Sequence, residues 1–364
     1  MFKLTAGIVG LLASQLAVAA VGTVSLVPLY QPPAGAAPVS FVVGDFNRDG
    51  KPDLAVVDQR SATVRILLGV GNGFFEPWVE YQVGINPVAI AMGDFNNDGK
   101  LDLAVASQLS NTLTILLGNG DATFRFFATL EAQGPTSLVI ADFNGDGKLD
   151  LAVANATSNS VSVWLGIGQG GFRPPLDFRV GENPVFLVAA DFNGDGKWDL
   201  ATANLASNNV SILLGNGTGL FPTVLNFPAG LAPTGLALGD FNGDGKMDLA
   251  VLNATGTKSS GFMSTVSVLL GSGHGYFQPP LTSVAAAKGS FILAVDLNND
   301  HKLDLAITDA SSNSLKVLLG LGNGFFAPPL NFAVGKGPAW IAPFETGLIV
   351  ANSLSDTLSV LSIR

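Results

Sequence analysis

The residues of this chain best suited to chemistry lie in a nine-residue loop that occurs six times. The first copy, Asp-Phe-Asn-Arg-Asp-Gly-Lys-Pro-Asp, occupies residues 45–53; the others occupy 94–102, 142–150, 191–199, 240–248 and 296–304. Every copy has Asp at positions 1, 5 and 9, Asn at position 3 and Lys at position 7, and five copies have Gly at position 6. Oxygen-bearing side chains at a fixed spacing in a short loop suit a hard divalent cation.

Calcium is the cation that this pattern favours, because Ca²⁺ takes about six to eight oxygen ligands and accepts flexible geometry. The side chains at positions 1, 3, 5 and 9 would supply four oxygens, and the backbone carbonyl of the Lys at position 7 a fifth. We therefore expect about six Ca²⁺ ions, one for each loop. The expected ligands are Asp45, Asn47, Asp49, Lys51, Asp53, Asp94, Asn96, Asp98, Lys100, Asp102, Asp142, Asn144, Asp146, Lys148, Asp150, Asp191, Asn193, Asp195, Lys197, Asp199, Asp240, Asn242, Asp244, Lys246, Asp248, Asp296, Asn298, Asp300, Lys302 and Asp304.

The alternative to a metal site is a turn rich in Asp, Asn and Gly that binds nothing. Six copies with the same oxygen positions favour the metal. The loop begins like a helical EF-hand, but position 12 of the first copy is Val56 rather than Glu, and extended segments flank it. The sixth copy has His301 instead of Gly at position 6, a less favourable residue for positive φ, so we expect the weakest site there.

The spacing of the loops predicts the fold. Their first Asp residues are 49, 48, 49, 49 and 56 residues apart, a period typical of propellers and other repeat proteins. Each unit contains four short apolar or alternating runs separated by turn residues, which predicts the four-stranded blade of a β-propeller. The long last spacing comes from an insertion around residues 254–265.

A seventh unit without the Asp loop ends the chain. Leu348–Asn352 matches Leu151–Asn155, but the unit has no fourth strand before Arg364. The segment after Val24 resembles the fourth strand that the last unit lacks. We therefore expect this N-terminal strand to complete the last blade and close the ring. The prediction is an all-β, seven-bladed propeller spanning residues 20–364. Its blades are expected to start near residues 38, 87, 135, 184, 233, 289 and 338.

The N-terminus predicts export. Lys3, the apolar stretch Leu4–Leu16 and Ala17–Ala19 resemble a secretory signal peptide over residues 1–19, and an uncleaved anchor or a buried segment is the alternative. We expect a secreted, cell-surface or periplasmic monomer with no transmembrane segment after cleavage. The chain has no cysteine and a net charge of −10, and no basic stripe suggests a nucleic-acid partner.

The third loop reads Asp-Phe-Asn-Gly-Asp-Gly-Lys-Leu-Asp-Leu-Ala at 142–152, and in units of this type a Leu-Leu-Gly segment and a Phe follow. The repeated unit resembles the FG-GAP or VCBS repeat. This repeat builds the propeller of the integrin α-subunit and of many secreted bacterial proteins. The resemblance implies seven blades with Ca²⁺ in the loops between first and second strands. It implies no single function, because members include adhesion modules, lectin-like binders and a few enzymes.

The expected function is recognition of a glycan or a protein partner on the face opposite the Asp loops, with calcium as a structural ion and the 254–265 insertion as that face's most individual feature. The alternatives are a lyase or hydrolase acting on polysaccharide, and a purely structural scaffold in a surface assembly. The chain has two histidines, His274 and His301, and no visible catalytic constellation, so we expect no enzyme activity. The repeated Phe residues of the loops and the Gly-rich turns are expected to pack between blades.

Overall fold

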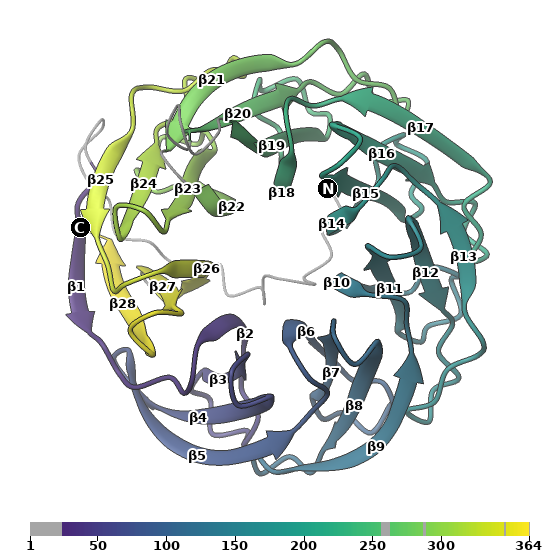
Figure 1. Cartoon of the computed structure of the whole chain (residues 1–364), viewed down its shortest axis with the longest axis vertical. Coiled ribbons are helices and arrows are strands. Elements are labelled where there is room, and N and C mark those ends of the chain that lie inside the picture. The colour runs from purple at the N-terminus through teal and green to yellow at the C-terminus, as the bar shows by residue number, and fades with distance from the viewer. Residues whose placement is uncertain (1–23, 256–262, 287–288, 346, 364) are drawn as a thin grey trace.

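The computed structural model describes residues 24–255, 263–286, 289–345 and 347–363. It is a ring of seven four-stranded antiparallel sheets arranged around a central axis (Figure 1). The predicted all-β propeller with seven blades is confirmed. Over the described ranges, no helix has the length and apolar character needed to cross a membrane. The expected signal peptide at 1–19 and residues 256–262 of the insertion lie outside the described residues.

We number the blades from the first complete one. The strands run from the innermost to the outermost in each blade except the last, whose outermost strand is N-terminal. Blades 1 to 4 comprise β2 (Pro38–Gly44), β3 (Asp53–Asp58), β4 (Thr63–Gly71) and β5 (Phe74–Gln82); β6 (Pro87–Gly93), β7 (Asp102–Ser107), β8 (Thr112–Gly118) and β9 (Phe124–Glu131); β10 (Pro135–Ala141), β11 (Asp150–Asn155), β12 (Ser160–Trp164) and β13 (Leu176–Arg179); and β14 (Pro184–Ala190), β15 (Asp199–Asn204), β16 (Asn209–Leu214) and β17 (Thr223–Pro228). Blades 5 to 7 comprise β18 (Pro233–Gly239), β19 (Asp248–Thr255), β20 (Met263–Leu269) and β21 (Leu281–Ala286); β22 (Gly289–Val295), β23 (Asp304–Asp309), β24 (Ser314–Leu318) and β25 (Leu330–Ala333); and β26 (Pro338–Phe344), β27 (Gly347–Asn352), β28 (Thr357–Ile363) and β1 (Leu26–Tyr30).

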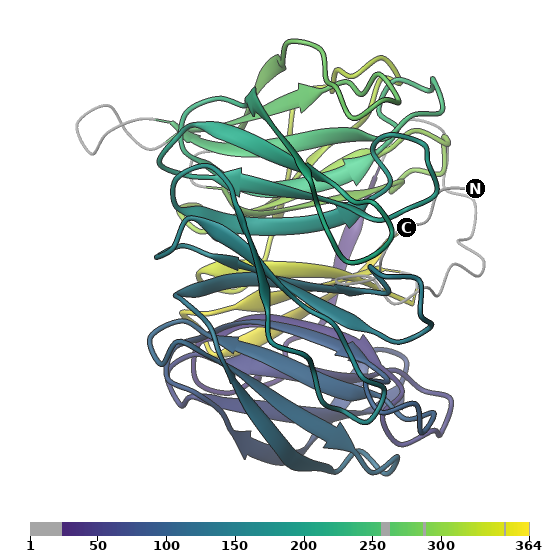
Figure 2. The same ribbon diagram turned by 90° about the vertical axis from the view of Figure 1, so that its right-hand side faces the viewer.

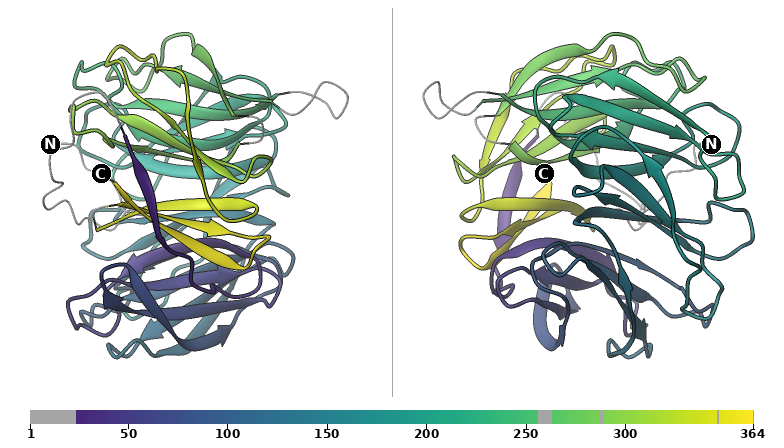
Figure 3. Two further views of the ribbon diagram at one scale, coloured as in Figure 1. Left: turned by 90° about the vertical axis from the view of Figure 1, so that its left-hand side faces the viewer. Right: turned by 45° about the vertical axis from the view of Figure 1, so that its right-hand side comes forward.

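The N-terminal strand closes the ring, as the sequence predicts. β1 pairs antiparallel with β28, with Leu26 opposite Ile363 and Pro28 opposite Leu361. The backbone N–H of Ala34 donates to the carbonyl of Asp356 at 3.0 Å just beyond the paired segment. The left panel of Figure 3 shows β1 lying along the C-terminal blade. The last blade is therefore built from both ends of the chain.

Burial falls from the inner strands to the outer ones. Every residue of the second strand in β3, β7, β11 and β15 is buried, because both faces of the sheet pack against neighbouring blades. The fourth strands are exposed on one side, as the pattern of β9 shows. Since the strands alternate in direction, loops between first and second strands share one face of the ring with turns between third and fourth strands. Figure 2 shows these two faces edge-on.

Aromatic pairs join successive blades, which confirms the packing role expected for the repeated Phe residues. The Phe at position 2 of an Asp loop meets the Phe after the Gly-rich turn of the following blade, with ring centroids 5.5–5.9 Å apart in near-perpendicular geometry. The pairs are Phe46–Phe124, Phe95–Phe172, Phe143–Phe221, Phe192–Phe277 and Phe241–Phe326. These ring pairs contribute to the packing of each blade on the next.

A polar pair links the second and third strands near the opposite face. In four blades an Asn amide donates to a Ser hydroxyl seven or fourteen residues later, at 2.7–3.0 Å. Blade 1 has Asp58 and Arg65 instead, with Arg65 Nε 3.4 Å from Asp58 Oδ2. Blade 6 has Asp309 and Lys316 at 3.6 Å. In these six blades the position holds either a neutral hydrogen bond or an ion pair, whereas blade 2 has Ser107 and Thr114 there.

Asp58→Asn should raise the stability of the fold at neutral pH. Burial raises the pKa of Asp58 to about 6, although the Arg65 guanidinium opposes the rise and Glu80 adds to it. A raised pKa in the folded state means that stability from the protonated form is present below pH 4 and is lost as pH rises through about 6. Asn is neutral throughout, and four other blades already use it.

Urea unfolding of the wild type and Asp58→Asn at several pH values, with calcium held constant, measures this effect. We expect the variant to gain on the order of 1 kcal/mol above pH 7 and to match the wild type near pH 4. A variant that loses stability equally at all pH values would show that the ion pair with Arg65 outweighs the burial of the charge.

Candidate metal loops and a pocket at the rim

The six Asp loops connect the first and second strands of blades 1 to 6 and hold their side chains in one repeated hydrogen-bond pattern. In the first loop, Asp45 Oδ1 and Asn47 Oδ1 both accept from the backbone N–H of Asp49, at 3.1 and 3.0 Å. Asp45 Oδ2 accepts from the N–H of Gly50 at 2.9 Å. Asp49 Oδ1 accepts from the N–H of Lys51 at 2.9 Å. The oxygens at positions 1 and 3 are thus brought together by a shared donor.

The Asp at position 9 is buried at the base of the loop and is bonded to the backbone on both sides. Asp53 Oδ2 accepts from the N–H of Phe46 at 2.9 Å, and Oδ1 accepts from the N–H of Gly69 at 2.8 Å. The same two bonds recur in the other five loops. Position 9 therefore ties each loop to the end of its third strand. Each carboxylate oxygen has a second lone pair, so the Asp at position 9 can accept these hydrogen bonds and still coordinate a metal ion.

Burial and neighbouring charge both disfavour ionisation at position 9. Burial raises the pKa of the carboxyl groups of Asp102, Asp150, Asp248 and Asp304 to about 6 and that of Asp199 to about 7. The backbone donors oppose the rise, whereas the carboxylates at positions 1 and 5 add to it. Three acidic groups are therefore close enough in each loop to repel one another.

The Lys at position 7 partly offsets this repulsion. Its ammonium lies 3.1–3.9 Å from the carboxylate at position 5 in all six loops. These pairs are exposed and contribute little to stability. Across the part of the chain that the structure describes, no three His, Cys, Asp or Glu side chains converge tightly enough to form a metal-binding cluster.

The donor set nevertheless fits calcium in its chemistry. All expected side-chain ligands are hard oxygens, and none lies on a helix or in a sulfur- or imidazole-rich cluster. The residues that would hold the ion are those at positions 1, 3, 5 and 9, with the position-7 carbonyl. Bound Ca²⁺ would supply positive charge between carboxylates that otherwise repel.

The sixth loop differs from the other five. His301 replaces Gly and keeps a positive φ of 65°, close to the 79–81° of Gly at this position elsewhere. Asp296 Oδ1 is buried and has no hydrogen-bond partner among the described residues, whereas the same atom of the first loop accepts from a backbone N–H. An unpartnered buried carboxylate oxygen is costly unless a ligand meets it.

His301→Gly should stabilise the protein by about 1 kcal/mol, because glycine adopts positive φ without strain. The measurement is urea unfolding with calcium and with chelator. Asn299→Gly is the matched control: Asn299 also has a positive φ, 58°, but Asn tolerates this conformation better, so we expect a smaller gain. An unchanged or lower stability for His301→Gly in both conditions would contradict the prediction.

The two histidines belong to different blades and are both exposed, His274 in the Gly-rich turn of blade 5 and His301 in the sixth loop.

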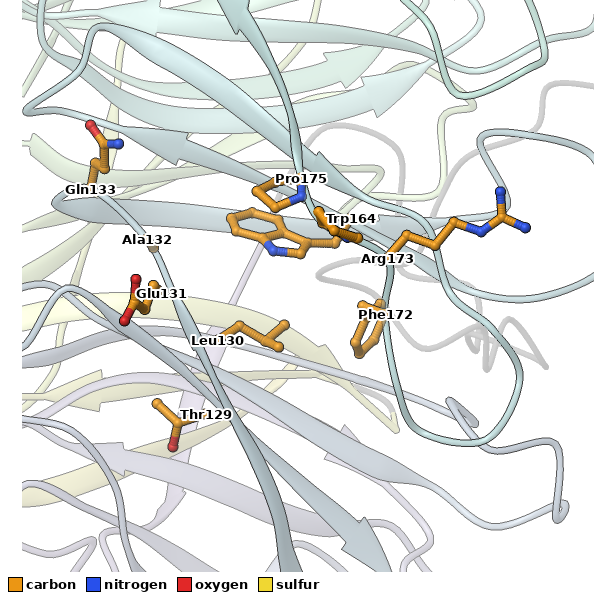
Figure 4. A pocket seen from close by; sticks show the side chains of 10 residues that line it. Thr129, Leu130, Glu131, Ala132, Gln133, Trp164, Phe172, Arg173 and Pro175 are labelled. Atoms are coloured by element: carbon orange, nitrogen blue, oxygen red, sulfur yellow. The ribbon is translucent and has the colours of Figure 1, made fainter.

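A pocket of about 520 Å³ lies at the rim between the outer strands of blades 2 and 3 (Figure 4). One wall is the end of β9 and the link that follows it; the other is the end of β12 and the segment leading to β13. The lining residues are Thr129, Leu130, Glu131, Ala132, Gln133, Trp164, Phe172, Arg173, Pro174 and Pro175.

Sequence reasoning missed this pocket, although one signal was present. Trp164 ends the third strand of blade 3, where the other six blades have Leu, as the strand register shows. A single large aromatic residue at a position otherwise occupied by Leu marks a local change in packing. Recognising that it borders a pocket also requires the neighbouring blade, which a repeat-by-repeat alignment does not place.

The fold and the loops together define a class of protein: a seven-bladed β-propeller whose blades carry repeated Asp loops. The FG-GAP-like repeat model matches residues 45–105, 94–153, 142–202 and 191–251. These matches span more than half of the chain, and the protein belongs to the FG-GAP-like repeat family.

Solved structures share the fold at low identity. BBS1N, in complex with ARL6DN, is 14% identical with a TM-score of 0.65, over 93% of this chain and 97% of that one. A periplasmic gluconolactonase of Pseudomonas aeruginosa is 15% identical with a TM-score of 0.63, over 87% and 88%. An Agrocybe aegerita lectin specific for non-reducing terminal N-acetylglucosamine is 18% identical with a TM-score of 0.57, over 90% and 85%. No curated protein sequence matches the chain.

Proposed function

We propose that the protein is an exported recognition propeller that Ca²⁺ stabilises and that binds a glycan or protein partner without chemical conversion. The observation that carries the proposal is the common architecture of the six loops. Each carries three carboxyl groups and an amide oxygen within nine residues and is anchored to the third strand through the Asp at position 9. A Ca²⁺ ion bound in such a loop would hold three strands of the blade together, so its role in this proposal is structural.

The location of the polar groups supports recognition over catalysis. The buried carboxylates accept backbone hydrogen bonds or face a basic side chain, as Asp53 and Asp58 do, so they are committed to holding strands together. The lectin among the similar folds supports binding, and the lactonase supports the enzyme alternative, each through likeness of fold. Export is proposed from residues 1–19.

Incubation of the purified protein with gluconolactone separates recognition from the lactonase alternative. We expect hydrolysis no faster than in buffer. Rapid calcium-dependent hydrolysis would overturn the recognition proposal, and a binding screen on immobilised glycans and surface proteins would identify the partner class.

A further inference from the structure

The pocket between blades 2 and 3 lies where the fourth strand of blade 2 lacks an aromatic residue that other blades carry; blade 5, which has Ser283 opposite Val266, lacks it as well. At the equivalent position of the fourth strand, blades 1, 3 and 4 have Tyr81, Phe178 and Phe227. These rings pack edge-to-face on Phe124, Phe221 and Phe277 of the following blade, at 5.7, 5.3 and 5.4 Å. Each ring fills the space between two outer strands.

Blade 2 has Leu130 at that position, opposite Leu113 of β8. Leu130 is shorter than the aromatic residues, and the space they fill in other blades stays open beside Phe172. Trp164 borders the same space with only 3% of its surface exposed. The apolar side of the pocket is therefore formed by Leu130 and Phe172, and the almost fully buried Trp164 supports it.

The mouth of the pocket is polar and carries one acidic and one basic side chain, Glu131 and Arg173. Thr129, Glu131, Gln133 and Arg173 are exposed, and within the described ranges their side chains make no hydrogen bond or ion pair. Figure 4 shows Glu131 and Gln133 on one wall and Arg173 on the other. Carboxylate, amide, hydroxyl and guanidinium groups are thus free to accept and donate at the edge of one cavity.

We propose that this pocket binds a neutral saccharide. A sugar ring has an apolar C–H face, which suits the apolar side formed by Leu130 and Phe172, and a rim of hydroxyl groups that both donate and accept. The paired presence of Glu131 and Arg173 disfavours a strongly charged ligand, because either sign would meet a like charge. The volume lies within the range of about 300–1,000 Å³ typical of small-molecule sites. The inference rests on the recognition function proposed above and names its ligand class.

Leu130→Phe tests the proposal, since it restores the wedge that other blades carry and closes the pocket without disturbing the fold. On an array of immobilised neutral oligosaccharides, we expect the wild type to bind at least one glycan and Leu130→Phe to lose at least about tenfold in affinity for it. Trp164→Leu, which introduces the residue of the other blades, should also weaken binding. Arg179→Gln is the matched control, because Arg179 occupies the position of Glu131 in the filled gap between blades 3 and 4 and should leave binding unchanged.

Thermal melting of each variant distinguishes a loss of binding at the pocket from a loss of folding. If Leu130→Phe melts like the wild type and still binds the glycan, the pocket is not the site, although a recognition function elsewhere stands. If the wild type binds no neutral oligosaccharide on the array, the saccharide proposal is wrong. The effect of chelator on melting is measured separately and reports on the calcium brace alone.

Discussion

Removing calcium with EDTA should lower the melting temperature of the protein by roughly 10–20 °C. A ligand that binds the folded state alone stabilises it by about 2.7 kcal/mol per site at a concentration one hundred times its Kd. On the calcium proposal six such sites contribute together, and without the ion the carboxylates within a loop repel one another. Scanning calorimetry of the calcium-depleted protein, before and after adding Ca²⁺ back, measures the shift.

Two variants serve as controls for this experiment. Asp142→Asn, at position 1 of the third loop, should reduce the shift by about the share of one site in six. Asp121→Asn changes an exposed Asp in a Gly-rich turn and should leave the shift as it is in the wild type. Equal melting temperatures with Ca²⁺ and with EDTA would show that calcium does not brace this ring.

Deleting β1 together with the segment up to Ala34 should abolish the cooperative unfolding transition. The deletion exposes the edge of β28 and removes Leu26 and Ala34 from the core, where they are 7% and 0% exposed. It also leaves the last blade with three strands and removes the pairing that ties the N-terminal segment to the C-terminal blade. We expect soluble aggregates or a broad, low-temperature transition in calorimetry and circular dichroism.

Adding a synthetic peptide of residues 24–34 to the deleted protein should restore the transition, because the missing strand pairs through its backbone with β28. A variant that lacks only residues 1–19 is the control and should melt cooperatively. If the deleted protein melted at the wild-type temperature without the peptide, closure by β1 would contribute little to stability.

The repeat period made the fold predictable from the sequence. Six Asp loops fixed the boundaries of six blades, and the match between Leu348–Asn352 and Leu151–Asn155 revealed the seventh. The last blade would otherwise leave the edge of its third strand unpaired, so the N-terminal strand was expected to pair there. The role of Phe46 and its equivalents also followed, since a large apolar residue at position 2 of all six Asp loops indicates a shared interface.

The second role of position 9 could not be read from spacing. Asp53 was expected as a metal ligand, and the structure adds two bonds from the N–H groups of Phe46 and Gly69. The sequence separates Asp53 and Gly69 by most of two strands, so only their pairing brings them together. The rim pocket could not be predicted from the sequence for the same reason. Leu130 and Trp164 belong to different repeats, and only the packing of one blade on the next makes them neighbours.

Calcium titration of the chelator-treated protein by isothermal calorimetry shows directly whether the Asp loops bind the ion. We expect saturation near six ions per chain, the number of Asp loops, and the loss of one ion in Asp142→Asn. A titration without heat, together with no calcium retained after dialysis, would show that the loops are hydrogen-bonded turns that bind no calcium.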